Sequence, residues 1–406
     1  MKEDVSPRIE SICVRNFRVL RDVNLTNLPP FAVFVGENGT GKSTVFQVFG
    51  FLKNALESNV DIALQRLGGY REVAGRGHTD EPILIKIQFR MRISGKDRLV
   101  TYNLEIDRGK GDKPVVLREY LSYKRMKYGS PFRFLDFKKG RGFAIENEDD
   151  FSKQDTDLLR VEEKLESPNI LAIKGLGQFE RFKAASTFRK LIENWHVSDF
   201  HISDARQHPD AAADEHLSPT GGNLPLVVQH LYHNEPDVLK NIIKKFQKRI
   251  PGMRDVIPHQ TEDGRVLLRF QDENFDIPFI ARYVSDGTIK MFAYMVLLND
   301  PKPHSFLCVE EPENQLYPDL MWVLAEELRD YARRGGQVFV STHSPDFLNF
   351  VEPEETYFMK KKHGESEIHP LSQNKQVVSL IEGGDQLGYL WGQGVFNPEM
   401  KYGNQS

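Results

Sequence analysis

The chain has few cysteines, no long apolar run and no basic leader. Its 406 residues contain only Cys13 and Cys308. Both lie in apolar, strand-like stretches, so we expect buried thiols in a reducing cytoplasm rather than a disulfide or a metal site. No apolar run approaches the roughly 20 residues that a membrane helix needs. The start, Met1–Asp4, is acidic where a signal peptide would be basic. These absences predict a cytoplasmic protein without a membrane partner.

The chain also has no strong excess of charge and no repeated pattern. Its formal net charge is −4, which argues against a wholly basic nucleic-acid binder but leaves a local basic face open. We find no internal repeat, low-complexity tract or sustained heptad pattern. Hydrophobic residues make up 39% and charged residues 28% of the chain, typical of a globular protein that is long enough for two or three lobes.

A glycine-rich segment carries the first chemical signal. It follows the wholly apolar run Phe31–Val35 and precedes apolar residues at helical spacing. The pattern Gly-x4-Gly-Lys-Ser is that of a P-loop, whose backbone N–H groups point at phosphate oxygens. Lys42 would contact the β- and γ-phosphates, and Ser43 would complete a Mg²⁺ shell. A chance glycine-rich turn is the alternative, and the flanking strand and helix argue against it. The expected ATP contacts are Gly36, Asn38, Gly39, Thr40, Gly41, Lys42, Ser43 and Thr44.

Two adjacent carboxylates follow a second apolar strand, Phe306–Val309. Mg²⁺ prefers hard oxygen ligands, so Glu310 is a candidate metal ligand. Glu311 is then placed to orient and deprotonate the attacking water. By itself, a carboxylate pair at a strand end is more often a solvated turn, and the P-loop is what favours a catalytic interpretation.

Two further residues are candidates for sensing phosphate. His343 follows a third apolar strand ending at Ser341, where its imidazole would contact the γ-phosphate. A structural or solvated histidine is the alternative. Ser285 and Gly287 stand at the start of the predicted helix Ile289–Leu298, and a helix N-terminus favours anions. An ordinary capping turn explains Ser285 equally well.

The spacing of elements predicts an α/β fold with three regions. Strand-like stretches between Pro82 and Ile145 indicate an inserted antiparallel subdomain. Residues Asp150–Glu166 are expected to be helical, Leu224–Ile250 to form helices and Val266–Phe279 to form a hairpin. The expected regions are an N-terminal ATPase lobe at 1–150, a helical lobe with its hairpin at 151–282, and a C-terminal ATPase lobe at 283–406.

Together these motifs resemble the ABC-type ATPase heads of the RecF, OLD and SMC group, and in particular compact bacterial ATPases of the OLD-like AAA type. The opening Ile12–Leu20 is similar to the first strand of these heads. Glu310–Pro318 is similar to their second motif and the D-loop that follows, and Ser285–Thr288 to a shortened signature. The resemblance covers nearly the whole chain and implies a P-loop NTPase head with a mixed central sheet, an inserted antiparallel β-subdomain and a helical lobe.

The resemblance implies several roles beyond those motifs. Ser285 would reach the γ-phosphate of ATP bound by a second copy, so two heads would sandwich the nucleotide and form a homodimer. Asn314 would lie at that seam. Arg18 would lie near the base or phosphates, and Gln178 would be the glutamine that contacts Mg²⁺ from a loop between the lobes.

The sequence departs from the family pattern in several places. Most ABC heads have aspartate where this chain has Glu310, and the signature lacks the paired glycines of transporter ATPases. The stretch after His343 is too short for the Toprim nuclease domain of OLD enzymes. No long coiled coil separates the motifs, as it does in SMC proteins. AAA+ rings, small-molecule kinases and transporter ATPases match less well.

Two functions remain open. The first is an ATP-driven switch in DNA repair or anti-phage defence, and the second is a regulatory ATPase that controls a partner nuclease or toxin without binding DNA. Basic residues interleaved with aromatics can bind a phosphate backbone, but solvated sheet edges give the same pattern. The candidate DNA contacts are Lys124, Arg125, Lys127, Arg133, Lys138, Lys139 and Arg141 among Tyr123, Tyr128, Phe132, Phe134 and Phe137, with a second cluster at Lys244, Lys245 and Lys248.

Overall fold

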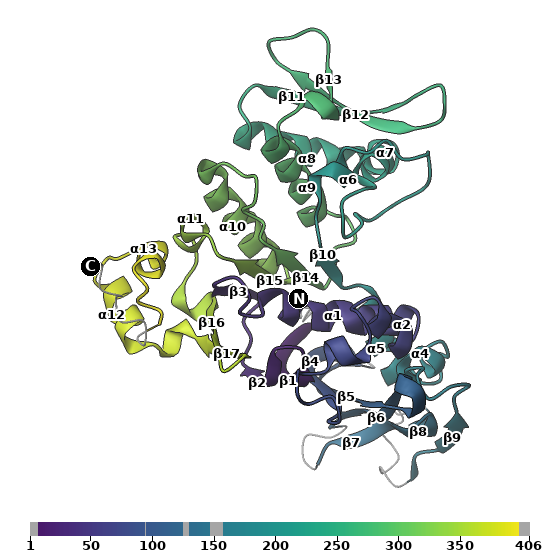
Figure 1. The fold of residues 1–406 in the computed structure, drawn as a ribbon. Helices are drawn as coiled ribbons and strands as arrows, with labels where there is room; N and C mark the ends of the chain where they lie inside the picture. Colours follow the sequence, from purple (N-terminus) through teal and green to yellow (C-terminus); the bar gives the residue numbers. More distant parts are fainter. Residues whose placement is uncertain (1–6, 94, 125–129, 147–156, 398–406) are drawn as a thin grey trace.

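A mixed six-stranded sheet forms the centre of the protein (Figure 1). The computed structural model describes residues 7–93, 95–124, 130–146 and 157–397. The strand order is β10-β14-β15-β3-β16-β17; only β17 is antiparallel to its neighbour. The carboxyl ends of the five parallel strands therefore meet at one edge. The strands are β3 (Phe31–Gly36), β10 (His196–Ser198), β14 (Phe306–Glu310), β15 (Gln337–Thr342), β16 (Thr356–Lys362) and β17 (Glu365–Pro370).

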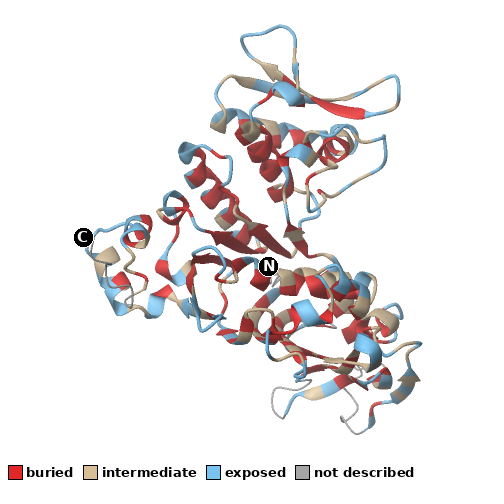
Figure 2. Cartoon of the chain, in the orientation of Figure 1, coloured by how far each residue is buried: buried red, intermediate tan, exposed pale blue. Residues whose placement is uncertain are grey.

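Strand β3 is buried along its whole length, as its apolar run predicts. Phe34 packs into the core that faces the N-terminal lobe, whereas Val33 and Val35 pack into the core on the opposite face. Apolar residues on both faces are what a central parallel strand requires. The helix that follows, α1 (Lys42–Glu57), lies against the first of these cores. Figure 2 shows the buried residues concentrated in these strands and their covering helices.

An eight-stranded antiparallel sheet forms most of the N-terminal lobe, in the order β2-β1-β4-β5-β6-β7-β8-β9. It confirms the inserted subdomain but continues beyond it. Residues Arg160–Lys164 form strand β9, paired with β8, so the helix predicted for Asp150–Glu166 is wrong there; residues 147–156 lie outside the described part. Pairing with the edge of β8 overrides the helical preference of Glu and Lys. The remaining strands are β1 (Arg8–Phe17), β2 (Leu20–Thr26), β4 (Ile83–Ile93), β5 (Lys96–Arg108), β6 (Pro114–Tyr123), β7 (Phe132–Lys138) and β8 (Arg141–Ile145).

Four short helices complete this lobe and extend it past residue 150. Phe188 of α5 packs against Phe89 and Tyr102 of the antiparallel sheet, with ring centroids 5.0 and 4.8 Å away. Trp195 belongs to the same core. The N-terminal lobe therefore includes the chain to about Trp195, further than the expected boundary. Its helices besides α1 are α2 (Val60–Gln65), α3 (Tyr70–Val73), α4 (Ala172–Leu176) and α5 (Lys183–Glu193).

The helical lobe lies on the other side of the central sheet (Figure 1, top). It contains the predicted helices and, in place of a single hairpin, a three-stranded sheet in which β12 pairs on both sides. The elements are α6 (Ile202–Ala205), α7 (Leu224–Asn234), α8 (Pro236–Arg249), β11 (Met253–Gln260), β12 (Val266–Asp272), β13 (Phe279–Ile280) and α9 (Asp286–Leu298).

The rest of the chain returns to the central sheet. Helix α10 packs beside β15 and β3, and the short helices α11 and α13 pack together. Cys308 is buried, as predicted, whereas Cys13 is partly exposed. Within the described residues, no helix is both long and apolar enough to cross a membrane. The helices are α10 (Pro318–Arg333), α11 (Pro345–Leu348), α12 (Lys375–Glu382) and α13 (Leu387–Gly392).

Candidate functional site

Segments far apart in the sequence meet at the carboxyl edge of the central sheet. Strand β3 pairs with β15, and β15 pairs with β14. The P-loop after β3, Glu310 at the end of β14 and His343 after β15 therefore share one edge, where open α/β sheets bind ligands. Strand β10 adds Asp199 to this edge, since Ser198 pairs with Val309.

Glycines and the C-terminal strands shape the P-loop. Gly39 and Gly41 have φ angles of 79° and 100°, in the left-handed region that glycine tolerates. A Cβ on Gly36 would lie 2.5 Å from a backbone oxygen of β16, so only glycine fits there. The hydroxyl of Ser366 donates to the carbonyl oxygen of Thr40 at 2.6 Å. Strands β16 and β17, which the sequence analysis did not identify, thus brace the loop.

Lys42 begins α1 with its ammonium group beneath the P-loop. Nζ donates to the carbonyl oxygens of Gly36 at 2.8 Å and of Glu37 at 3.1 Å. Burial lowers the pKa of Lys42, and the nearby carboxylates that follow β14 oppose this shift. An ammonium group has three N–H donors, so one remains for a ligand oxygen.

Three oxygen-bearing side chains, those of Ser43, Glu310 and Asp199, lie together beside the P-loop. All three line one cavity of about 840 Å³. Burial raises the pKa of the Glu310 carboxyl; a hydrogen bond with Ser43 lowers it, and the charges of Asp199 and Glu311 raise it. Two carboxylates and a hydroxyl form the hard donor set that Mg²⁺ prefers. These residues fit the metal that the P-loop implies.

The structure places Gln178 away from this donor set. It is exposed in the turn after α4, and it is not among the residues that line the two cavities at the P-loop. Asp199, which the sequence analysis missed, lies instead in the connection from β10 to the helical lobe. The available signal was one acidic residue after the stretch His196–Ser198, which is too short to be recognised as a strand without its partner β14.

Glu311 is held in a left-handed conformation, with φ of 41°, by a bond from its N–H to the Ser341 carbonyl oxygen at 2.9 Å. Its carboxylate accepts from Nδ2 of Asn314 at 2.9 Å and lies 3.2 Å from Nδ1 of His343. Burial raises the pKa of Glu311, but Asn314 and the charges of His343 and Lys42 outweigh burial, so the pKa is lowered. The carboxylate is therefore ionised at neutral pH, as a general base must be.

A second carboxylate in the same turn, that of Glu313, is buried and positions His343. Its Oε1 accepts from the Thr342 hydroxyl at 2.5 Å and from the His343 backbone N–H at 3.2 Å. The imidazole of His343 is 45% exposed and faces Glu311. Glu313 thereby fixes the end of β15 to the turn after β14.

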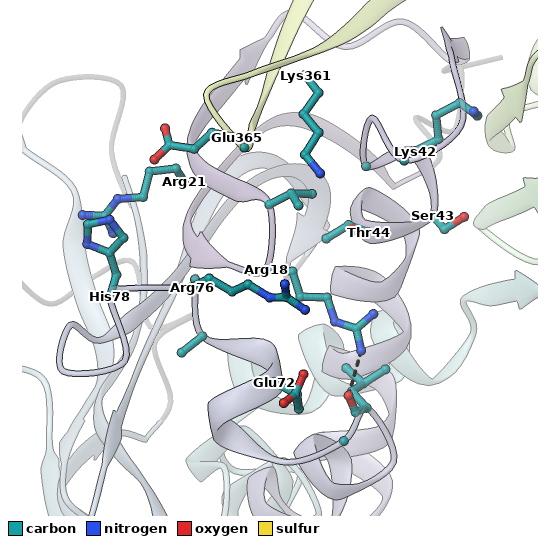
Figure 3. A pocket seen from close by; sticks show the side chains of 18 of the residues that line it. Arg18, Arg21, Lys42, Ser43, Thr44, Glu72, Arg76, His78, Lys361 and Glu365 are labelled. Carbon is teal, nitrogen blue, oxygen red and sulfur yellow. Dashed lines mark hydrogen bonds between the residues drawn. The ribbon is translucent and has the colours of Figure 1, made fainter.

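A cavity of about 1010 Å³ extends from the P-loop over the N-terminal lobe (Figure 3). Arg18 lines it and donates to the Gln47 side chain and to the Leu67 carbonyl oxygen, both at 2.7 Å. Figure 3 shows Lys361 and Arg76 also directed into this space. The cavity is lined by P-loop residues together with side chains that the sequence analysis missed, namely Arg21, Glu72, Arg76, His78, Lys361, His363 and Glu365.

The signature segment starts α9 beside the cavity that contains Ser43 and Glu310, and its residue Asp286 lines that cavity. Ser285 caps the helix, accepting from the Thr288 N–H at 3.2 Å, so the capping interpretation is confirmed. Ser285 is nevertheless exposed and is not among the residues that line either cavity. A Cβ on Gly287 would lie 2.9 Å from the Gln315 carbonyl oxygen. The helix start therefore packs tightly on the D-loop and leaves the Ser285 hydroxyl at the surface.

The first basic and aromatic cluster separates into a core and a surface. Tyr123, Phe134 and Phe137 are buried, and the rings of Tyr123 and Phe134 stack with centroids 3.9 Å apart. Arg133 pairs with Asp136 at 3.0 Å. The exposed cations of this cluster are Lys124, Arg133, Lys138, Lys139 and Arg141, and the positions Arg125, Lys127 and Tyr128 lie outside the described residues.

The second cluster is also partly structural. Lys245 donates to Glu327 at 3.0 Å and to Asn299 at 2.9 Å, which ties α8 to its neighbours. Lys244 and Lys248 remain exposed.

Comparison with known proteins identifies the family. Residues 31–349 match the family described as "AAA domain, putative AbiEii toxin, Type IV TA system". The chain belongs to this AAA-domain family. No curated protein matches it.

Solved structures show the same fold at low identity. An SMC head bound to the C-terminal winged-helix domain of ScpA is similar at TM-score 0.53 and 12% identity, with 91% of this chain and 99% of that chain covered. An SMC head domain with an extended coiled coil, bound to the C-terminal domain of ScpA and derived from Pyrococcus furiosus, is similar at TM-score 0.50 and 12% identity, with 93% of this chain and 100% of that chain covered. The AAA domain thus has the α/β fold of ABC-type ATPase heads.

Proposed function

We propose that this AAA-domain protein binds ATP with Mg²⁺ and hydrolyses it as a molecular switch. One observation carries the proposal: the P-loop, Glu310, Glu311 and His343 converge at one edge of a parallel sheet. Family membership supports nucleotide binding, and the ABC-type fold supports hydrolysis.

Each side chain has a distinct task in this proposal. Lys42 uses its free N–H to hold the β- and γ-phosphates. Ser43, Glu310 and Asp199 hold Mg²⁺, which neutralises phosphate charge when bound. Glu311 accepts the proton of the attacking water, and His343 contacts the γ-phosphate. The fixed 3.2 Å separation of Glu311 and His343 supports a coupling between water activation and phosphate sensing.

We further propose that hydrolysis requires two copies. The Ser285 hydroxyl is exposed at a helix start and is not among the residues that line the cavities at the chain's own P-loop, which supports a contact with ATP held by a partner copy. Asn314 is exposed beside it in the D-loop and holds Glu311. In a homodimer, the partner would therefore contact Asn314, which holds the catalytic base, and its Ser285 would contact the phosphate.

Glu311→Gln tests the catalytic assignment. Loss of the general base should lower ATP turnover by about 10²- to 10⁴-fold while nucleotide binding persists, and light scattering with ATP and Mg²⁺ should show a trapped dimer. Lys42→Ala should lose both binding and turnover.

Glu354→Gln is the matched control and should behave as the wild type, because Glu354 is exposed just before the amino end of β16, whereas the P-loop lies at the carboxyl edge of the sheet. Unchanged turnover in Glu311→Gln would refute the assignment of the base. A mass that never responds to ATP would refute the dimer.

The target of the switch is proposed to be a partner protein, such as a nuclease or toxin. The description of the family as a putative toxin of a type IV toxin–antitoxin system supports this. The burial of Tyr123, Phe134 and Phe137 removes these rings as stacking platforms for bases. A role in DNA repair or anti-phage defence through direct DNA contact then rests on the exposed lysines and arginines alone.

A salt titration of binding to duplex and single-stranded DNA separates these functions. Phosphate contacts make affinity fall steeply with salt, so the partner-protein proposal predicts no salt-sensitive binding at low ionic strength. Salt-sensitive binding that Lys138→Glu with Lys139→Glu abolishes would establish the DNA-binding function instead.

A further inference from the structure

A cluster of His216, Asp300 and His304 lies at the end of β14 opposite to the nucleotide site. Two segments supply it: the loop before α7 carries His216, and the connection from α9 to β14 carries Asp300 and His304. Each offers one ligand atom, and the three atoms lie within 4.8 Å of one another. We propose that these side chains bind a divalent transition-metal ion, for which Zn²⁺ is the natural probe.

The strongest observation is the imidazole of His304. Its Nδ1 lies 2.8 Å from the carbonyl oxygen of Asn194, which can only accept, so Nδ1 carries the proton and Nε2 carries the lone pair. Nε2 is buried and has no hydrogen-bond partner among the described groups, although buried polar atoms are nearly always paired. A histidine whose other nitrogen donates to a backbone carbonyl is oriented as metal-bound histidines are.

The carboxylate of Asp300 is likewise buried and is oriented by a backbone hydrogen bond. Its side chain is only 6% exposed, and Oδ1 accepts from the backbone N–H of Lys302 at 2.8 Å. Oδ2 faces Nδ1 of His216 at 2.7 Å. One oxygen is therefore fixed by the backbone, and the other points into the cluster.

The electrostatic surroundings keep the cluster available to a cation. Burial lowers the pKa of His304, and the charges of His216 and Lys53 lower it further, against the hydrogen bond to Asn194 and the charge of Asp300. The bond from the His304 Nδ1–H to the Asn194 carbonyl oxygen leaves the Nε2 lone pair as the ligand atom. Lys53 is itself bonded to the Trp195 carbonyl oxygen at 2.5 Å, which holds its ammonium group on a separate acceptor.

The donor set indicates the class of ion. Two imidazoles and one carboxylate, without a thiolate, suit Zn²⁺ and neighbouring transition metals better than Mg²⁺. Donors around one tetrahedral Zn²⁺ lie about 3.4 Å apart, so a small movement of the loop that carries His216 would close the site. That side chain is 39% exposed, which leaves an entry path and a fourth position for water.

The proposed ion would be structural rather than catalytic. His304 and Glu310 are separated along β14 by about 20 Å, so the ion is remote from the phosphates. It would join the loop before α7 and the end of α9, both in the helical lobe, to the central sheet. The proposal is independent of the ATPase proposal.

Zn²⁺ binding to metal-free protein tests the inference. Titration against a chromophoric competitor, without nucleotide and with Mg²⁺ present, should show one tight Zn²⁺ per chain and a rise in thermal midpoint. His216→Gln and Asp300→Asn should weaken binding by about 10- to 100-fold or more and lose the thermal response. These variants also avoid the buried His304, whose substitution risks the fold.

Two controls locate the ion. His208→Gln changes an exposed histidine of the same loop and should bind as the wild type does. Glu310→Gln should also retain tight Zn²⁺, which excludes the nucleotide site. Equal Zn²⁺ affinity in the wild type and in His216→Gln, or loss of the tight ion in Glu310→Gln, would overturn the proposal.

Discussion

At the scale of single residues, Asp199 makes the most specific prediction. It faces Glu310 across the ends of β10 and β14 and lines the cavity that contains Ser43. Asp199→Asn removes one charge from the proposed Mg²⁺ site, so the Mg²⁺ concentration for half-maximal turnover should rise by about 10- to 100-fold. A magnesium titration of steady-state ATPase activity measures this. Gln178→Ala is the control and should leave the magnesium requirement unchanged; the reverse pattern would restore Gln178 as the ligand.

The same residues show what could be predicted from the sequence. Lys42, Ser43 and Glu310 belong to motifs whose spacing carries the chemistry, and they meet in the structure as expected. Asp199 and Gln178 belong to no local motif. Whether such a residue lies near Glu310 depends on which strand pairs with β14. That pairing is a contact across more than a hundred residues, which local pattern cannot supply.

At the scale of elements, the carboxyl of Glu119 predicts a pH dependence of stability. Glu119 lies in β6 and accepts from the backbone N–H groups of Ala172 and Ile173 at 2.5 and 3.1 Å, and from Tyr102 at 3.1 Å. Burial raises the pKa of Glu119 to about 7, although these hydrogen bonds lower it. The folded protein thus holds a proton that the unfolded chain releases near pH 4.5. The contribution of Glu119 to the free energy of unfolding therefore falls as the pH rises from about 4.5 to about 7, and it is constant above about pH 7.

Glu119→Gln lacks this titration. The stability advantage of the wild type over the variant should therefore shrink between pH 5 and pH 7, by an amount on the order of 3 kcal/mol at most. Urea unfolding followed by the fluorescence of Trp195, with Trp322 and Trp391 replaced by Phe, would measure it in the N-terminal lobe. Glu105→Gln, on the adjacent strand, is the control and should show a constant difference. A constant difference for Glu119→Gln as well would contradict the prediction.

Helices and strands could be predicted from the sequence where the apolar residues follow one clear pattern. The wholly apolar run of β3 and the helical spacing of α1 gave correct elements. Strand β9 did not, because Arg160–Lys164 is charged and is a strand only through its pairing with β8. Strands β16 and β17 were missed although they hold the P-loop, since nothing in Thr356–Pro370 shows which loop they will contact.

At the scale of the whole molecule, the P-loop and the exposed Ser285 lie on different parts of one chain. The P-loop opens at the edge of the central sheet, whereas Ser285 is exposed at the start of α9 in the helical lobe. In a two-fold dimer, each site would combine the P-loop of one copy with Ser285 of the other. The order of motifs allowed this half-site to be predicted, but the exposure of Ser285 had to come from the structure.

Mixing two inactive variants tests this arrangement. Lys42→Ala retains Ser285, and Ser285→Arg retains the P-loop; each alone should be inactive because every site in its homodimer is defective. Random pairing makes half of the dimers heterodimers, and each heterodimer has one intact site of two, so an equal mixture should recover up to about a quarter of wild-type ATPase activity. Recovery should follow the concentration of the mixture, because it requires association. If Ser285→Arg alone hydrolyses ATP at the wild-type rate, the site is complete within one chain. If both variants are inactive and their mixture stays inactive while light scattering shows ATP-dependent heterodimers, Ser285 does not act across the seam.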